Sequence, residues 1–247
     1  MDTTTTRAAD AYERHRRELL AYATRLVARP EVAEELVQDA AVRMLASATV
    51  PSEPSEARAW LFKVVTNLAI DHLRRHSTWR ELVLVDTKER CARDDQFIAM
   101  SRSMRGSAEQ KAIAIEHLTV CFSCTVRNLA PFEAAALLLK EMYEFSTSET
   151  ATALDATEGQ VKNWLQQARR TLEVRYAETC ALVAKDGVCH QCVELDRFFN
   201  GTERNPLEGT ARDLDARLAI LRRDREAPLG TWHRHMLRIL ADAIAGG

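Results

Sequence analysis

Residues 57–75 are the most informative stretch of this chain, and they read ARAWLFKVVTNLAIDHLRR. Apolar side chains recur every three or four positions, which predicts one amphipathic helix from about residue 56 to 75. Other side chains share that spacing and therefore lie along one stripe of the helix: Trp60, Lys63, Asn67, Asp71 and Arg74. Lys and Arg side chains bind phosphates, and aromatic and amide side chains contact exposed nucleobases. The stripe therefore favours a surface that binds bent or melted DNA. In the alternative interpretation, Trp60 belongs to the hydrophobic core and the Lys and Arg side chains are simply exposed to solvent.

Helical spacing continues on both sides of this stretch. It predicts helices over residues 11–29 and 31–47, divided by Pro30, and then a loop over residues 48–56. Residues 76–110 are polar and mixed, which predicts a partly helical linker. A second helical block starts near residue 112. Two more helices are expected at about 210–225 and 231–245.

The second block contains the pattern of a helix-turn-helix. Pro131 suits the first turn of a helix. Ser146 with Glu149, and Thr157 with Gln160, each form a capping-box pattern before a run of helix-forming residues. Two short helices joined by a brief turn then follow one another, as a helix-turn-helix requires.

Composition and charge exclude several classes of protein. The chain has 247 residues with only 8 Gly and 6 Pro, which disfavours many-turned sandwiches and barrels. Its net charge of −2 excludes a uniformly basic nucleic-acid binder but not a locally basic one. Residues 31–41 carry four acidic side chains and no base, whereas residues 58–80 carry five Lys or Arg and one Asp. Such asymmetry indicates two faces with different partners, unless the two helices simply pair with each other.

The chain contains no long apolar run and its start has no apolar signal core. We therefore expect a cytoplasmic protein without membrane insertion.

The stretch RAWLFKVVTNLAIDHLRR resembles the promoter-reading helix of the sigma-70 family, in its extracytoplasmic-function (ECF) branch. Upstream, EVAEELVQDAAVRML resembles the helix by which that family binds core RNA polymerase. Downstream, APFEAAALLLKEMYEFSTSETATALDATEGQVKNWLQQARRTL resembles its −35-reading helix-turn-helix. The resemblance covers about residues 10–176.

The resemblance implies an all-α fold with two helical domains, a linker and a helical C-terminal extension. We expect a region-2-like domain over residues 10–90, a linker over 91–118, a region-4-like domain over 119–176 and the extension over 177–247.

The resemblance also assigns roles to individual residues. Those that would dock on core polymerase are Glu35, Leu36, Gln38 and Asp39. Those that would meet the −10 element are Arg58, Trp60, Lys63, Asn67, Asp71, Arg74 and Arg75. Those that would read the −35 element are Lys162, Asn163, Gln166, Gln167, Arg169 and Arg170.

The chain departs from the family pattern within the helix-turn-helix. Asp155 occupies the turn position where this family usually has Gly, and Thr150 occupies a position where an aliphatic core residue is common. Asp tolerates left-handed backbone better than most residues, so the turn can survive.

Four of the six cysteines form two Cys-x-x-Cys pairs, Cys121 with Cys124 and Cys189 with Cys192. Two such pairs can complete a tetrahedral zinc site, although 64 residues separate them here. Redox-active thiols and simple helix packing are the alternatives, and the spacing does not decide among the three. Cys91 stands apart and is expected to bind no metal.

The function that these patterns favour is a sigma factor, which would bind RNA polymerase core and promoter DNA under metal or redox control and would not itself be an enzyme. The family resemblance leaves room for an anti-sigma partner. The alternative function is a one-component helix-turn-helix regulator that senses metal or oxidant. A repressor needs no polymerase contact, so the acidic helix over residues 31–41 discriminates the two. A zinc enzyme is disfavoured because no general base lies near the cysteines in sequence.

Overall fold

The fold is taken from a computed structural model, which describes residues 3–47, 50–76, 89–91, 93–103, 116, 126, 129–179, 214–223, 225–226 and 229–245. All regular structure in these ranges is helical, so the all-α prediction is confirmed. The chain forms two compact units. The first comprises Met1–Ser77, Leu129–Ala168 and Asp224–Pro228, and the second comprises Thr78–Asn128, Arg169–Arg223 and Leu229–Gly247.

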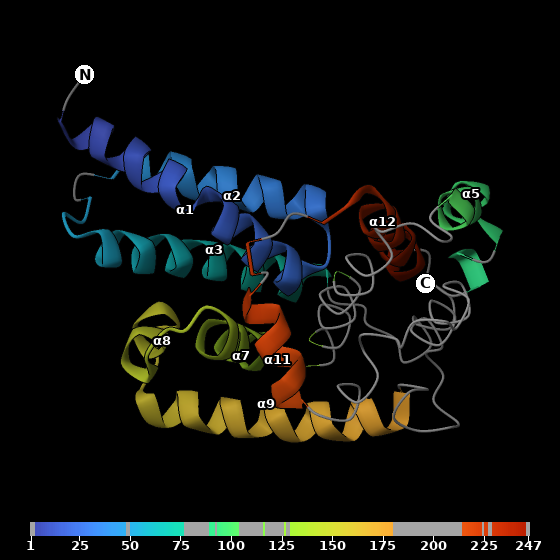
Figure 1. The fold of residues 1–247 in the computed structure, drawn as a ribbon. Helices are drawn as coiled ribbons and strands as arrows, with labels where there is room; N and C mark the ends of the chain where they lie inside the picture. Colours follow the sequence, from blue (N-terminus) through green and yellow to red (C-terminus); the bar gives the residue numbers. More distant parts are fainter. Residues whose placement is uncertain are drawn as a thin grey trace. The chain divides into compact units, whose positions relative to one another are not determined.

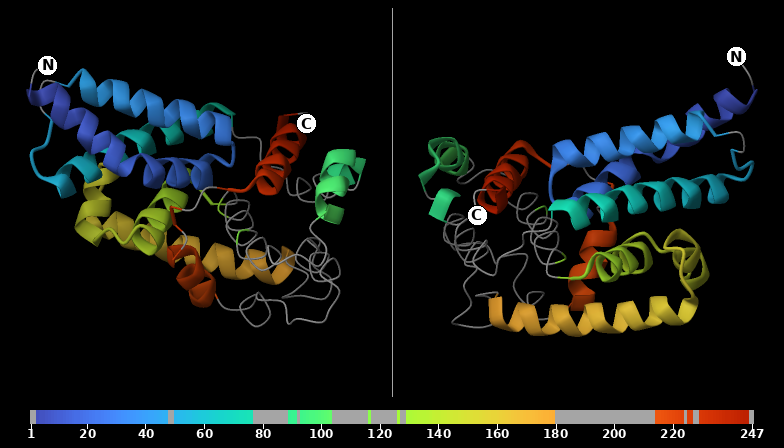
Figure 2. Two further views of the ribbon diagram at one scale, coloured as in Figure 1. Left: turned by 45° about the horizontal axis from the view of Figure 1, so that its top comes forward. Right: turned by 180° about the vertical axis from the view of Figure 1, so that it is seen from behind.

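The first unit begins with a bundle of three helices, α1 (Thr3–Val27), α2 (Pro30–Leu45) and α3 (Pro54–His76), which lie side by side in Figures 1 and 2. The predicted helices are all present, but α1 starts eight residues earlier than its apolar spacing indicated. No breaker precedes residue 11, and Ala8 is buried, so packing extends the helix. Ala28 with φ 55° ends α1, and Pro30 occupies the first turn of α2.

Large apolar side chains from all three helices fill the bundle. A buried polar pair lies among them: Tyr22 on α1 and Thr66 on α3 approach to 2.7 Å between their hydroxyl oxygens. Thr66 Oγ1 donates its only proton to the carbonyl of Phe62 at 2.6 Å, so Tyr22 donates to Thr66. Burial raises the pKa of Tyr22, which keeps this donor protonated.

The same unit contains a helix-turn-helix module, which comprises α7 (Pro131–Leu137), η1 (Leu138–Met142), α8 (Thr147–Ala153) and the part of α9 (Glu158–Thr179) up to Ala168. Both predicted capping boxes form. Ser146 Oγ accepts from Glu149 N at 3.1 Å, and Glu149 Oε2 accepts from Ser146 N at 2.7 Å. Thr157 and Gln160 make the equivalent pair of bonds at the start of α9.

The two departures from the family pattern are accommodated. Asp155 has φ 48°, so the turn takes the left-handed conformation that was expected to survive with Asp. Thr150 is fully buried, and its hydroxyl donates to the carbonyl of Ser146 at 2.8 Å. The hydroxyl is therefore satisfied inside the apolar interior of the module.

The π-helix η1 was not predicted from the sequence. Its wide turn shows in the bond from Tyr143 N to Leu138 O, at 3.1 Å, which spans five residues. Glu144 with φ 58° then ends the helix. Tyr143 and Phe145, on either side of Glu144, are both buried against the α1–α3 bundle through Tyr22 and Phe62. Apolar spacing with the α-helical period of 3.6 residues gives no signal for a π-helical turn.

The second unit contains α5 (Asp95–Ser103), α11 (Leu214–Arg223), α12 (Thr231–Ala245) and the remainder of α9. Helix α5 lies inside the predicted linker, where partial helix was expected. Two carboxylates anchor the start of α12. Glu116 accepts a hydrogen bond from the backbone nitrogen of Gly230, directly before α12, and lies 2.9 Å from the buried side chain of His233. Asp94 pairs with His235 at 2.8 Å. An acid near a helix N-terminus also complements the helix dipole.

Candidate nucleic-acid interface

Helix α3 carries the residues predicted to meet DNA. Asp71, Arg74 and Arg75 are exposed, whereas Trp60, Lys63 and Asn67 are half-buried. Their order along the helix shows that exposure increases toward its C-terminal end. The predicted stripe therefore exists as a surface, but its N-terminal half is partly covered.

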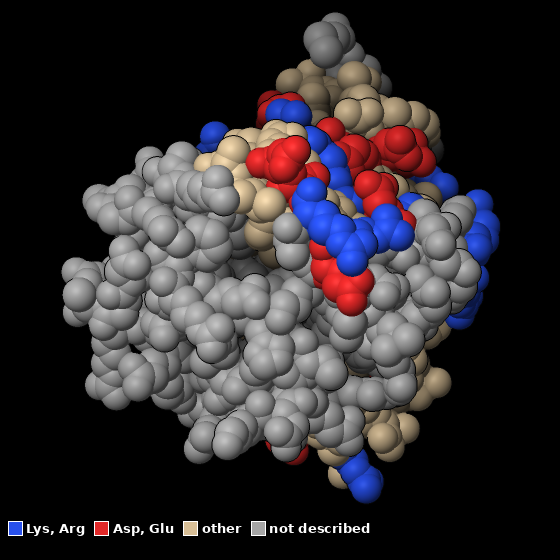
Figure 3. Space-filling view, turned by 90° about the vertical axis from the view of Figure 1, so that its right-hand side faces the viewer, with Lys and Arg blue, Asp and Glu red and all other residues tan. Residues whose placement is uncertain are grey.

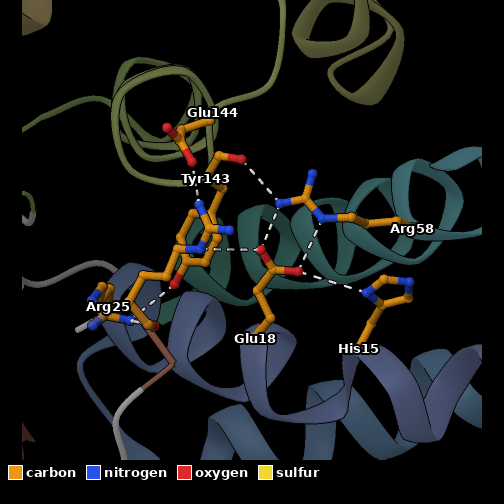
Figure 4. A network of polar contacts seen from close by, with 7 residues as sticks. His15, Glu18, Arg25, Arg58, Tyr143 and Glu144 are labelled. Carbon is orange, nitrogen blue, oxygen red and sulfur yellow. Dashed lines mark hydrogen bonds and ion pairs between the residues drawn. The ribbon is translucent and has the colours of Figure 1, made fainter. Parts of the chain in front are cut away.

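Arg58, also predicted to meet DNA, is engaged inside the protein. Its Nε and Nη2 donate to the two carboxylate oxygens of Glu18 on α1, at 2.9 and 2.6 Å. Nη2 also donates to the backbone carbonyl of Tyr143, at 3.0 Å, and the guanidinium carbon lies 4.3 Å from the ring centre of Phe145. Figure 4 shows Arg58 between the bundle and the helix-turn-helix module. In this structure Arg58 joins the two helical parts of the first unit.

Two further basic residues of α3, Lys63 and Arg74, contact the helix-turn-helix module. Lys63 forms an ion pair with Asp155, the residue at the left-handed turn. The guanidinium of Arg74 lies 5.3 Å from the ring centre of Phe132 on α7, and Phe132 stacks on Trp164 of α9. Of the four Lys and Arg residues on α3, three are thus in contact with the helix-turn-helix module: Arg58, Lys63 and Arg74.

Helix α9 presents the residues predicted for the −35 element. Those exposed to solvent are Lys162, Asn163, Gln166, Gln167 and Arg170. Arg169 is half-buried and pairs with Asp215 on α11 at 3.2 Å. Most of the predicted recognition surface is therefore available, while Arg169 already has an acidic partner.

Helix α2 presents most of the residues predicted to contact polymerase. Glu35, Gln38 and Asp39 are exposed, but Leu36 is buried in the bundle. Sequence reasoning missed two exposed apolar residues, Val42 and Leu45, which are 64% and 48% exposed. Residues 35, 38, 42 and 45 follow a three–four spacing, so they form one stripe that is acidic at one end and apolar at the other. That spacing could have been recognised in the sequence.

Glu18 and Arg225 are the other residues that sequence reasoning missed. Glu18 is buried and contacts Arg58, His15 (3.7 Å) and Arg225 (3.8 Å). Burial lowers the pKa of His15, an effect opposed by Glu18 and reinforced by Arg58 and Arg14. Arg58 and Glu18 are 40 residues apart in the chain, so no short-range pattern pairs them.

Charges are mixed rather than segregated on the one face that Figure 3 shows. On the face in Figure 3, the described acidic and basic side chains lie next to one another. None of the described helices is long and apolar enough to cross a membrane. Among the described residues no cluster of three or more His, Cys, Asp or Glu could hold a metal ion. Cys121, Cys124, Cys189 and Cys192 lie outside those residues, while Cys91 is described and buried.

The fold thus defines a helical protein with a three-helix bundle and a helix-turn-helix, and comparisons with known proteins place it in a family. Residues 11–78 match the sigma-70 region 2 model, and residues 119–172 match that of sigma-70 region 4. The chain is 30% identical over 172 residues to the ECF RNA polymerase sigma factor SigL of Mycobacterium tuberculosis, which covers 68% of this chain and 87% of SigL.

Two further relatives agree. The probable ECF RNA polymerase sigma factor SigI of Mycobacterium tuberculosis is 24% identical over 96% of this chain and 81% of its own length. The ECF RNA polymerase sigma factor SigX of Bacillus subtilis is 23% identical over 65% of this chain and 79% of its own. The chain belongs to the sigma-70 family of RNA polymerase sigma factors, in its ECF branch.

Proposed function

We propose that this sigma factor binds core RNA polymerase through α2, reads promoter DNA through α3 and α9, and performs no chemistry itself. The observation that carries the proposal is the exposed stripe of Glu35, Gln38, Val42 and Leu45 on α2. Glu35, with exposed Asp39 beside the stripe, gives electrostatic complementarity, and the neighbouring apolar side chains give a desolvated contact. Together these features suit a partner helix. The protein would act in the cytoplasm, where it meets polymerase, and an anti-sigma factor is a further candidate partner.

For promoter DNA, the support is the position of the polar residues on both DNA-facing helices. Lys162, Asn163 and Gln166 are exposed on the first turns of α9, where a recognition helix contacts base edges. Trp60 and Asn67 lie beside Lys63 on α3, which suits contacts with unpaired bases.

For metal or redox control, we propose that Cys121, Cys124, Cys189 and Cys192 bind one zinc ion. The support is their arrangement as two Cys-x-x-Cys pairs on either side of the helix-turn-helix. Oxidation of zinc-bound thiolates would release the metal, so a zinc site and redox control are compatible.

The experiment for polymerase binding reverses the charge at two exposed positions, with Glu35→Arg and Asp39→Arg in one chain. We expect the dissociation constant for core polymerase to rise by about tenfold or more. The matched control is Glu31→Arg with Glu34→Arg, two exposed acids on the same helix that lie outside the predicted contact. Core pull-down and run-off transcription are measured together.

Unchanged core affinity in the Glu35–Asp39 variant would contradict the assignment of α2. Specific DNA binding by a wild-type chain that binds no core polymerase would favour the one-component regulator instead.

A further inference from the structure

The N-terminal half of α1 carries a set of exposed basic residues that lies outside the helices predicted to contact DNA. Residues 3–17 hold four arginines and two acids, so this surface is positive. Among the residues that the structure describes, none of the four arginines forms an ion pair with an acid. All four are exposed to solvent: Arg7, Arg14, Arg16 and Arg17.

Two of these arginines lie on the edge of α1 that faces α3. Residues seven and eleven positions apart project from one side of a helix, so Arg7, Arg14 and Glu18 share an edge. Glu18 accepts two hydrogen bonds from Arg58 on α3, and Figure 4 shows its side chain directed toward that helix. Arg7 Nη1 donates to Ser52 Oγ at 3.4 Å, two residues before α3 begins. The edge therefore adjoins the start of α3, as the positions of the two helices in Figures 1 and 2 also show.

The two arginines differ from the basic residues of α3 in their availability. Arg58, Lys63 and Arg74 each contact another group of the protein. Arg7 and Arg14 are exposed, so they can neutralise phosphates without any rearrangement of the chain. Seven residues of α-helix place them about 10 Å apart along the helix axis. About three phosphates of one DNA strand fit into that length, so each arginine can bind a separate phosphate.

We propose that Arg7 and Arg14 form a phosphate-binding edge, which holds the backbone of the DNA strand whose bases contact α3. This inference rests on the proposed promoter-reading role of α3. It is carried by charge complementarity and by the continuity of the edge with α3. Phosphate contacts position a strand without reading its sequence. The edge would therefore fix the strand in place, while Trp60 and Asn67 contact its bases.

An acidic protein surface is the other kind of ligand that exposed arginines suit. The charge of α2 argues against polymerase as that ligand. Exposed Glu35 and Asp39 on α2 require a basic surface on the polymerase, and such a surface would repel arginines on the neighbouring helix. The position of the edge beside α3 favours DNA.

The test compares the full-length wild type with Arg7→Gln and Arg14→Gln. The control is Arg16→Gln, which removes the same charge from the same helix at an exposed position on the other side. Gln is a good helix former, so α1 should stay intact, and circular dichroism checks this. The probes are fluorescein-labelled single strands of oligo-dT and oligo-dA, measured by anisotropy from about 50 to 200 mM salt.

We expect Arg7→Gln and Arg14→Gln each to raise the dissociation constant by about threefold or more, equally for both probes. Each variant should also lower the slope of log affinity against log salt by about 0.7, the value for one phosphate contact with a single strand. Arg7→Lys and Arg14→Lys keep the charge and should keep the wild-type slope. Arg16→Gln should behave as the wild type does.

Three results would overturn the phosphate-binding edge. They are losses no larger than that of Arg16→Gln, a loss confined to one of the two probes, and wild-type protein that binds neither probe at the lowest salt. If one variant fails to fold, the other decides.

A core pull-down with the same variants separates this proposal from the proposed function. Weaker core binding with unaltered DNA affinity would assign the arginines to polymerase and overturn the edge. Lost DNA affinity in the variants of a chain whose wild type binds no core would support the edge and reject the sigma role of α2.

Discussion

The guanidinium of Arg58 on α3 holds the carboxylate of Glu18 on α1 in two hydrogen bonds, at 2.9 and 2.6 Å. Glu18 is 5% exposed, and Arg58 reaches past it to the backbone carbonyl of Tyr143 in the helix-turn-helix module. A bidentate pair of this kind is stronger and more directional than a single hydrogen bond. It stabilises the bundle and the packing of the module on it at the same point.

Arg58→Ala should destabilise the folded protein. The change leaves the buried Glu18 carboxylate with only the more distant Arg225 and His15, and should lower the free energy of unfolding by about 2–4 kcal/mol. Arg75→Ala, at an exposed position of the same helix, is the control and should change stability little. Urea unfolding followed by circular dichroism measures both. A normal stability with weakened DNA binding would instead assign Arg58 to DNA.

Asp155→Val should destabilise the helix-turn-helix, since a β-branched residue is strained at φ 48°. We expect a loss of about 1–2 kcal/mol. Asp155→Gly is the matched variant: it also removes the ion pair with Lys63 but relieves the backbone, so it should cost far less. Equal losses in the two variants would mean that the ion pair, rather than the turn, determines the effect. Thermal unfolding distinguishes the two.

Stability should fall as the pH drops through the range in which His15 titrates. Burial lowers the pKa of His15 below 6.5, so the unfolded chain takes up this proton first as the pH falls. The folded state is favoured fully above pH 6.5 and loses that advantage below it. His15→Gln should reduce this part of the pH slope, measured as the urea midpoint at a series of pH values. An identical slope in His15→Gln would show that other groups cause it.

Asn67→Ala should impair promoter opening while leaving core binding nearly intact. Asn67 is half-buried on the predicted DNA stripe and makes no side-chain hydrogen bond to a described residue, so its loss should not affect folding. The change would remove contacts to unpaired bases only. Fluorescence of 2-aminopurine placed in the melted region reports opening. Equal loss of opening and core binding would indicate a structural role; Trp60→Ala should behave as Asn67→Ala does.

Purified protein should contain about one zinc ion per chain if the two cysteine pairs form a closed tetrahedral site. Cys189→Ser should lose the metal, because a site with three thiolates binds zinc more weakly. Cys91→Ser should retain it, since Cys91 is not one of the four proposed ligands. Metal analysis of protein prepared without added zinc is the measurement. Metal-free wild-type protein would leave packing or redox thiols as the role of the cysteines.

The sequence by itself determined most of the helices and their order, although it gave no signal for η1 and placed the start of α1 too late. Apolar spacing located α2 and α3, and Ser146 and Thr157 marked the starts of α8 and α9. The resemblance to the sigma-70 family marked Asp155 as the turn position. These signals are local, because a helix period, a cap and a turn each depend on residues within a few positions of one another. The exposed residues on α2 and α9 were named from the resemblance to the sigma-70 family, which is carried by local stretches of sequence.

Tertiary structure alone decided which of the named residues are buried or already have partners inside the protein. Leu36 was predicted at the polymerase contact and is buried in the bundle, and Arg58 was predicted at DNA and binds Glu18. Arg225 reaches Glu18 and Glu144 across a long stretch of chain. Pairings of this kind depend on how whole helices pack against one another. Helical spacing in the sequence predicts on which face of its helix a residue lies, but not which distant residue it contacts.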